Sequence, residues 1–135
     1  MSHFHAVAWI DHHEAHVLHF TMDEAQRTVV HAHGRERQVH HRKGAVGAGK
    51  AQVDPAFFKA VADALADAQE VLVCGPAQAK QEFMKFLGKH AAETAKRVVA
   101  VENADHPTDG QLLDHARRFF VAADRMGVQP GTRPT

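Results

Sequence analysis

The sequence "VLVCGPAQAKQEFMKFL" at residues 71–87 contains both parts of an α/β unit. Its first residues form a short continuous apolar run, which is typical of a strand covered on both faces. Gly75-Pro76 is a turn signal. After it, Phe83, Phe86 and Leu87 recur at helical spacing. The pattern predicts a buried strand that ends at this turn and a helix over residues 77–91.

Clear helix and strand signals flank this unit on both sides. Asp54 is a good N-cap and Pro55 suits the first helical position, so a helix is predicted over residues 55–69. The run "RVVAVENA" at residues 97–104 predicts another strand. Thr108 with Gln111 three residues later fits a capping box, which predicts the start of a last helix.

The N-terminal part predicts three further strands. "HFHAVAWIDH", "EAHVLHFT" and "RTVVHAHG" are separated by short polar linkers, which is typical of an antiparallel meander. The predicted order is therefore β-β-β-α-β-α-β-α. This order indicates an α/β fold with a mixed five-stranded sheet, helices on its faces and a ribonuclease-H-like topology.

Length and composition set the remaining limits. With 135 residues, the chain is expected to form one domain over residues 1–126, followed by a disordered polar tail over 127–135. A single cysteine, Cys74, excludes a disulfide framework. No signal peptide and no apolar run long enough to span a membrane is visible, so a cytoplasmic protein without a membrane partner is expected.

The positive charge is concentrated in one segment. The formal net charge of the chain is 0, but residues 35–50 carry five Lys or Arg against one Glu. The segment contains Gly44-x-x-x-x-Gly49-Lys50, which is most of a phosphate-binding P-loop. However, Ala51 follows in place of the metal-binding Ser or Thr, and the helix start signal at Asp54-Pro55 comes several residues late. A nucleotide site is therefore disfavoured.

A flexible basic loop can instead follow an irregular phosphate backbone and bind it through counterion release. The predicted RNA-binding residues are Arg35, Arg37, His40, His41, Arg42, Lys43 and Lys50. The alternative is a solvated charge run. Lys80, Lys85 and Lys89 on the second predicted helix could extend the basic surface, although lysines on a helix surface usually only interact with solvent.

Histidine is abundant, with 13 in the chain. If Phe4, Ala6, Ala8 and Ile10 share one face of the first strand with Leu18 and Phe20, alternation collects up to five imidazoles on the other face. These metal candidates are His3, His5, His19, His31 and His33. Three imidazoles within reach would make a plausible zinc site, but no Cys-x-x-Cys or His-Glu-x-x-His pattern supports one. The alternative is partly exposed histidines at strand ends.

A nuclease reading rests on carboxylates. Nucleases of ribonuclease-H-like fold bind two metal ions through carboxylates, and one of these carboxylates lies on the first strand. Asp11 with Asp105 or Asp109 could mimic that arrangement. Asp11 also lies at a predicted hairpin turn, where Asp is favoured in any case. Glu102, Asp105 and Asp109 are equally well explained as strand-end and helix-start residues.

Taken together, these segments resemble a known family over about residues 4–125. The run "VLVCGPAQAKQEFMKFL" is similar to the strand–Gly–helix segment in the middle domain of archaeal and eukaryotic class 1 release factors and of Pelota, their ribosome-rescue relative. "AVAWIDHHEAHVLHF" resembles the first hairpin of that domain, and "VVAVENADHPTDGQLLDHA" resembles its last strand and helix. "VHHRKGAVGAGKAQ" falls where that domain has its basic, Gly-rich loop. The chain thus resembles a bacterial homologue of the translational machinery protein type.

The resemblance implies a role in translation but argues against peptide release. Release factors carry Gly-Gly-Gln in this loop for peptidyl-tRNA hydrolysis, whereas this chain has Gly47-Ala48-Gly49-Lys50-Ala51-Gln52. Pelota also lacks the motif and acts by binding. The expected function is non-catalytic binding of the ribosome, rRNA or tRNA, without a cofactor and without the family's other two domains. Two alternatives stay open, which are a metal-dependent nuclease or hydrolase and a protein-interaction stress module.

Overall fold

The computed structural model describes residues 5–32 and 54–125. It contains a five-stranded sheet in the order β3-β2-β1-β4-β5. The strands are β1 (His5–Ile10), β2 (Glu14–Phe20), β3 (Ala25–His31), β4 (Glu70–Gly75) and β5 (Val98–Asn103). Since β2 runs antiparallel to β1 and β3 while β1, β4 and β5 are parallel, the sheet is mixed, as predicted.

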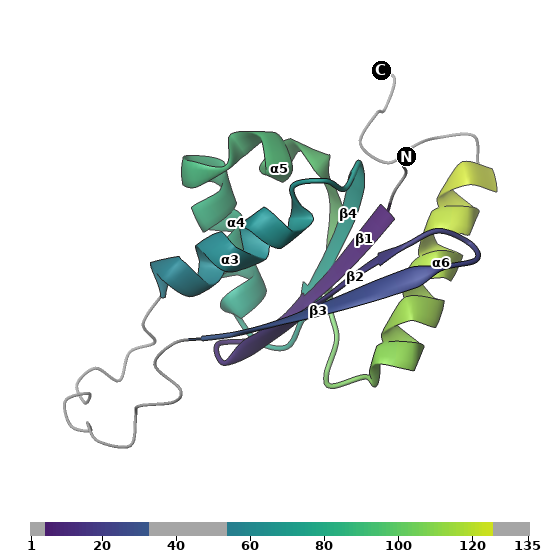
Figure 1. The fold of residues 1–135 in the computed structure, drawn as a ribbon, viewed down its shortest axis with the longest axis horizontal. Coiled ribbons are helices and arrows are strands. Elements are labelled where there is room, and N and C mark those ends of the chain that lie inside the picture. The colour runs from purple at the N-terminus through teal and green to yellow at the C-terminus, as the bar shows by residue number, and fades with distance from the viewer. Residues whose placement is uncertain (1–4, 33–53, 126–135) are drawn as a thin grey trace.

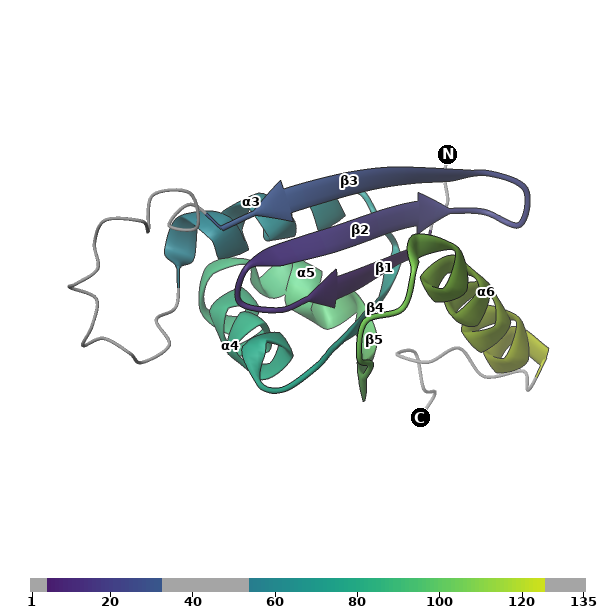
Figure 2. The ribbon, with the colours of Figure 1, turned by 90° about the horizontal axis from the view of Figure 1, so that it is seen from below.

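Helices cover both faces of the sheet (Figure 1). The helices α3 (Pro55–Leu65) and α4 (Ala79–His90) lie on one face, and the short α5 (Ala92–Arg97) follows α4 on the same side (Figure 2). The helix α6 (Asp109–Arg125) lies on the opposite face. The predicted α/β architecture is thus confirmed, with α5 as an additional element. The predicted tail over 127–135 lies outside the described residues.

Two apolar cores result from this layering. On the α3 and α4 side, Ala8 and Ile10 of β1 pack with Phe58 and Phe83. On the α6 side, the alternate residues of β1, including Trp9, pack with Phe20 and Phe120. The central strands are therefore apolar on both faces, which is the pattern that the continuous run Val71–Gly75 predicts.

Several local signals form as the sequence predicts. The Asp54 side chain accepts a hydrogen bond from the backbone N–H of Phe57 and caps α3. Before α6, the N–H of Thr108 donates to Oε1 of Gln111, and the N–H of Gln111 donates to Oγ1 of Thr108. This reciprocal pair is the predicted capping box.

The predicted end of α3 at residue 69 is wrong, because the helix ends at Leu65. The Arg97 guanidinium, at the end of α5, donates to the carbonyl oxygens of Ala66 at 2.9 Å and Ala68 at 3.4 Å. Carbonyls at a helix end need such partners. A side chain 31 residues further along the chain therefore helps to set this boundary, and no local signal encodes it.

Candidate functional site

The histidines of β1 and β2 do not share one face of the sheet. In the antiparallel register His5 lies opposite Phe20 and His19 lies opposite Ala6. Directly opposed residues point to the same side, so His5 faces α6 and His19 faces the α3 side. The predicted face that combined His5 with His19 is therefore wrong. The prediction placed Leu18 and Phe20 beside Ala6 and Ala8, whereas they pack with Trp9 against α6.

His31 does not approach His5 either. It lies opposite Glu14 at the start of β2, while His5 lies opposite Phe20 at the end of that strand. Six residues of strand separate the two positions, or roughly 20 Å. His3 and His33 lie outside the described residues. Within the described ranges, no group of three or more His, Cys, Asp or Glu side chains is arranged to hold a metal ion.

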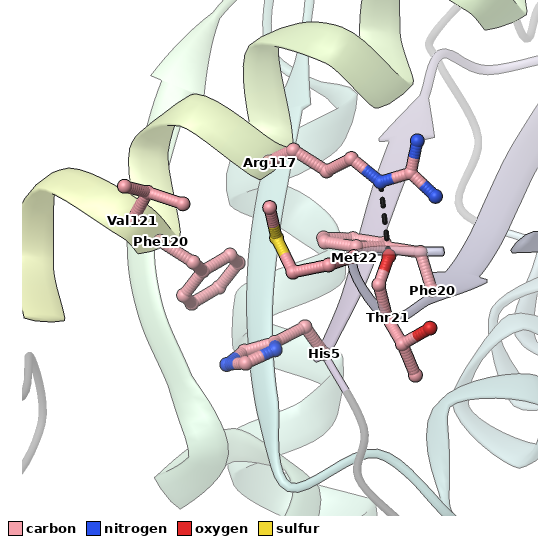
Figure 3. A pocket seen from close by; sticks show the side chains of 7 residues that line it. All are labelled: His5, Phe20, Thr21, Met22, Arg117, Phe120 and Val121. Atoms are coloured by element: carbon pink, nitrogen blue, oxygen red, sulfur yellow. Dashed lines mark hydrogen bonds between the residues drawn. The ribbon is translucent and has the colours of Figure 1, made fainter. Parts of the chain in front are cut away.

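His5 instead takes part in packing. Its ring lies 4.3 Å from the ring of Phe120, centroid to centroid, and its Nε2 lies 3.2 Å from Oε1 of Glu70. It contributes to a cavity of about 250 Å³ between the start of β1, the β2–β3 turn and α6 (Figure 3). The residues that line this cavity are His5, Phe20, Thr21, Met22, Arg117, Phe120 and Val121.

Arg117 on the rim of this cavity is held by backbone atoms. Its Nε donates to the carbonyl oxygen of Thr21 at 2.9 Å, and its Nη2 donates to that of Glu24 at 3.0 Å. The guanidinium therefore fastens the β2–β3 turn to α6 (Figure 3). Because these N–H groups bind backbone carbonyls of the β2–β3 turn, Arg117 stabilises the fold at this position.

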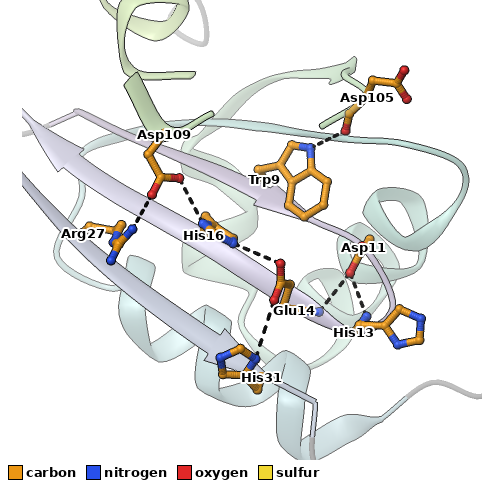
Figure 4. Close-up of polar contacts among 9 residues, drawn as sticks. All are labelled: Trp9, Asp11, His13, Glu14, His16, Arg27, His31, Asp105 and Asp109. Carbon is orange, nitrogen blue, oxygen red and sulfur yellow. Dashed lines mark hydrogen bonds and ion pairs between the residues drawn. The ribbon is translucent and has the colours of Figure 1, made fainter. Parts of the chain in front are cut away.

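A network of charged side chains joins β2, β3 and the start of α6 (Figure 4). Nδ1 of His16 lies 3.0 Å from Oδ1 of Asp109, and Nε2 of His16 lies 3.2 Å from a carboxylate oxygen of Glu14. Arg27 donates to the other Asp109 oxygen at 2.6 Å, and His31 lies 3.7 Å from Glu14. Each basic side chain of the network thus lies beside a carboxylate, which is an arrangement that stabilises the fold.

Asp109 is the centre of this network. Partial burial alone would raise the pKa of its carboxyl group, but the hydrogen bonds from Arg27 and His16 outweigh burial and lower this pKa below its ordinary value of 3.8. The Asp109 carboxylate is therefore charged, and each of its two oxygens already has a partner. It also lies in the first turn of α6, where a negative charge interacts favourably with the helix dipole.

The other acidic residues of the nuclease hypothesis also have local roles. Oδ1 of Asp11 accepts hydrogen bonds from the backbone N–H groups of His13 at 2.8 Å and Glu14 at 2.9 Å (Figure 4). This is the turn arrangement that Asp favours. The backbone carbonyl of Asp105 accepts a hydrogen bond from the Trp9 indole at 3.0 Å. Glu102 lies 2.8 Å from His115. None of these contacts favours a metal-dependent nuclease.

The turn after β4 is closely packed. A Cβ atom at Gly75, whose φ is +154°, would lie 2.2 Å from the carbonyl oxygen of Ile10. Ala77, two residues after Gly75, has a φ of 50°. Nζ of Lys80 donates to the carbonyl of Ala77, and the Lys80 side chain is only 3% exposed. The expectation that Lys80 extends a basic surface is therefore wrong. Lys85 and Lys89 are exposed, as expected.

The predicted RNA-binding residues Arg35, Arg37, His40, His41, Arg42, Lys43 and Lys50 lie outside the described residues, as does the P-loop-like motif. In sequence, their segment connects His31 at the end of β3 with Pro55 at the start of α3. Among residues 5–32 and 54–125, no helix is both long and apolar enough to cross a membrane.

Sequence reasoning missed the carboxylate partners of the histidines. His5, His12, His16, His31 and His115 each lie within 4 Å of a carboxylate oxygen. The only local signal is the spacing of Glu14 and His16, which share one face of β2. The other partners come from elements far apart in the chain. His12 pairs with Glu82 over 70 residues, for example.

Comparison with known proteins gives a consistent result for the fold. No protein-family model matches the chain. No curated protein matches it either. Several solved structures are similar, and three of them illustrate the result. They are Pelota from Archaeoglobus fulgidus (TM-score 0.61, 17% identity), Pelota from Thermoplasma acidophilum (0.57, 16%) and the archaeal translation termination factor aRF1 (0.57, 17%).

The similarity covers nearly all of this chain but only part of each larger protein. It spans 92%, 93% and 91% of this chain and 35%, 42% and 39% of the respective structures. At such low identity the likeness concerns the fold. The chain therefore has the fold of one domain of Pelota and of an archaeal translation termination factor.

Proposed function

We propose that this protein is a translation-associated, non-catalytic protein that binds the ribosome or RNA, and that the domain it resembles is the middle domain of Pelota and the release factors. The observation that carries the proposal is the fold similarity, which extends over more than nine tenths of the chain to two kinds of translation factor. The sequence contributes the second support, because residues 35–50 concentrate positive charge between β3 and α3.

The proposed RNA-binding residues are Arg35, Arg37, His40, His41, Arg42, Lys43 and Lys50. Their cationic side chains would contact phosphates and position the protein without reading sequence. The chain has no Gly-Gly-Gln in this segment, so we propose binding without hydrolysis. Ribosomal RNA and tRNA are the proposed partners, and the cytoplasm is the proposed location.

Sedimentation of a cell lysate through a sucrose gradient tests this function. Tagged protein is expected to migrate with ribosomal particles at low salt and to dissociate from them at moderate salt. The variant Arg42→Ala/Lys43→Ala/Lys50→Ala is expected to remain at the top of the gradient. Migration of the unmodified protein only at the top would contradict the proposal.

A charge-matched control separates the segment from total charge. Lys96 and Arg118 are exposed and each is ion-paired on its own helix. Lys96→Ala/Arg118→Ala removes the same number of positive charges as the double variant Arg42→Ala/Lys43→Ala. The control is expected to migrate like the unmodified protein, whereas Arg42→Ala/Lys43→Ala is expected to lose ribosome association. Equal loss of ribosome association in both variants would show that residues 35–50 have no special role.

A further inference from the structure

Two lysines differ from the other basic residues of the described ranges. The side chains of Arg27, Lys59, Lys96 and Arg118 pair with carboxylates, and those of Lys80, Arg97 and Arg117 donate to backbone carbonyls. Among the Lys and Arg side chains that the structure describes, only Lys85 and Lys89 have no such partner. Their positive charges are therefore available to a ligand.

The two lysines form a continuous strip on α4. They are four residues apart, so they lie on one face of the helix about 6 Å apart along its axis. Both are exposed. Glu82, the acidic residue one turn before Lys85 and Phe86, lies 2.8 Å from Nε2 of His12 and forms no ion pair with either lysine.

An aromatic pair runs beside this strip. Phe86 and His90 are also four residues apart, each directly following one of the lysines. Their ring centroids are 4.7 Å apart with an interplanar angle of 36°. Phe86 is partly buried against the core, where it meets Phe58, while His90 is exposed. The His90 ring thus rests on a fixed support and has an exposed face.

These rings border a groove between α3 and α4 with a volume of about 520 Å³. Its lining consists of Pro55, Ala56, Lys59, Ala62, Asp63, Phe86, His90 and Ala91. Lys59 and Asp63 on the opposite wall form an ion pair at 3.1 Å, which makes that wall neutral overall. The groove therefore has mainly apolar walls, and Lys85 and Lys89 lie outside its lining, each next in sequence to a ring that lines it.

We propose that this groove binds single-stranded RNA, with an unstacked base against His90 and Phe86 and the adjoining phosphates on Lys85 and Lys89. Aromatic side chains beside a basic strip are the common means of holding single-stranded nucleic acid without sequence preference. An acidic peptide would use the lysines but not the aromatic faces. The proposal rests on the RNA-binding function proposed above and places a second contact region on the folded part of the chain.

The lysines are tested by fluorescence anisotropy with a labelled 12-nucleotide single-stranded RNA of mixed sequence. Lys85→Ala/Lys89→Ala is expected to weaken binding at low salt at least fivefold and to reduce the slope of log affinity against log salt by about 1.4, or about 0.7 for each lost phosphate contact. The control Lys96→Ala/Arg118→Ala removes two ion-paired cations and is expected to bind within twofold of the unmodified protein.

The aromatic pair is tested by two changes at His90. His90→Ala is expected to weaken RNA binding about fivefold or more with little change in the salt slope, because it removes a stacking surface. His90→Phe is expected to restore binding. Unchanged binding in His90→Ala would overturn the base-binding site, even if the lysine variant binds weakly. An acidic peptide such as polyglutamate that competes equally well at matched charge would overturn it as well.

The outcomes distinguish this proposal from the function on which it rests. If the unmodified protein does not bind this RNA but still migrates with ribosomal particles, only the groove proposal is overturned. If Arg42→Ala/Lys43→Ala/Lys50→Ala weakens binding while the α4 variants behave like their control, only the groove proposal is overturned. All the α4 positions changed are exposed, so circular dichroism is expected to show folded protein for each variant.

Discussion

His16 on β2 and Asp109 at the start of α6 are 93 residues apart in the chain, yet Nδ1 of the imidazole lies 3.0 Å from the carboxylate. The contact fixes the N-terminal end of α6 over the sheet. It also places Asp109 where Arg27 of β3 binds its other oxygen. One carboxylate thus connects three elements.

We predict that Asp109→Asn lowers the free energy of unfolding by about 1 kcal/mol at neutral pH, because it weakens the charged hydrogen bond from Arg27 and the contact with His16, both partly screened by solvent. Since folding lowers the pKa of Asp109, this contribution is fully present above its ordinary pKa of 3.8 and is lost as pH falls through the lower folded value. Urea unfolding between pH 7 and pH 2 measures the effect. A difference from the unmodified protein that stays constant over this range would contradict the assignment.

Gly75 and Gly88 give opposite predictions for the same change. Gly75→Ala is expected to destabilise the fold by about 3 kcal/mol or more, because its Cβ would lie 2.2 Å from the Ile10 carbonyl oxygen at a φ of +154°. Gly88→Ala, in α4 with no atom within 4 Å of the new Cβ, is expected to stabilise it by roughly 0.5–1 kcal/mol. Chemical denaturation measures both. A stable Gly75→Ala variant would contradict the close approach of β1 and β4.

Arg117→Lys tests the attachment of the β2–β3 turn to α6. Lysine keeps the charge but cannot donate to the carbonyls of Thr21 and Glu24 in the same fork geometry, so we expect a loss of about 1 kcal/mol. Arg118→Lys is the matched control, because Arg118 forms an exposed ion pair with Asp114, and a change within about 0.5 kcal/mol is expected. Equal thermal stability of the two variants would show that the turn does not depend on Arg117.

Cys74 is predicted to be unreactive in the folded protein. Burial, together with the nearby Glu102 carboxylate, raises the pKa of its thiol from 9.0 to about 12, although Lys80 acts in the opposite direction. A thiol reagent at pH 8 is expected to modify Cys74 only after unfolding in urea. Rapid modification of the native protein would contradict its burial.

The same pKa shift predicts a loss of stability at high pH. Because the folded pKa lies above the ordinary value, the stabilisation is complete below pH 9.0 and declines as pH rises toward 12. Cys74→Ala is expected to reduce this decline in unfolding experiments between pH 8 and pH 11. An unchanged decline would assign it to other groups.

The sequence failed to predict the histidine positions for a specific reason. The notion of one apolar face and one polar face suits a sheet that is covered on a single side. Here α6 covers the second face, so Leu18 and Phe20 are as buried as Ala15 and Val17. When alternate residues of a strand are apolar on both faces, the alternation does not show which residues face which layer of helices. A wrong assignment moves every side chain of the strand to the other face of the sheet.

By itself, the sequence determined the elements and their order. Asp54 with Pro55, Thr108 with Gln111, and the run Val71–Gly75 act through neighbours within a few residues, so their signals are visible locally. Short connections then allow few sheet topologies. The tertiary structure alone decided the burial of Lys80, the contact of Arg97 with the carbonyls after α3 and the carboxylate partners of the histidines. These depend on contacts between distant segments, whose register and layering are fixed only when both faces of the sheet are covered.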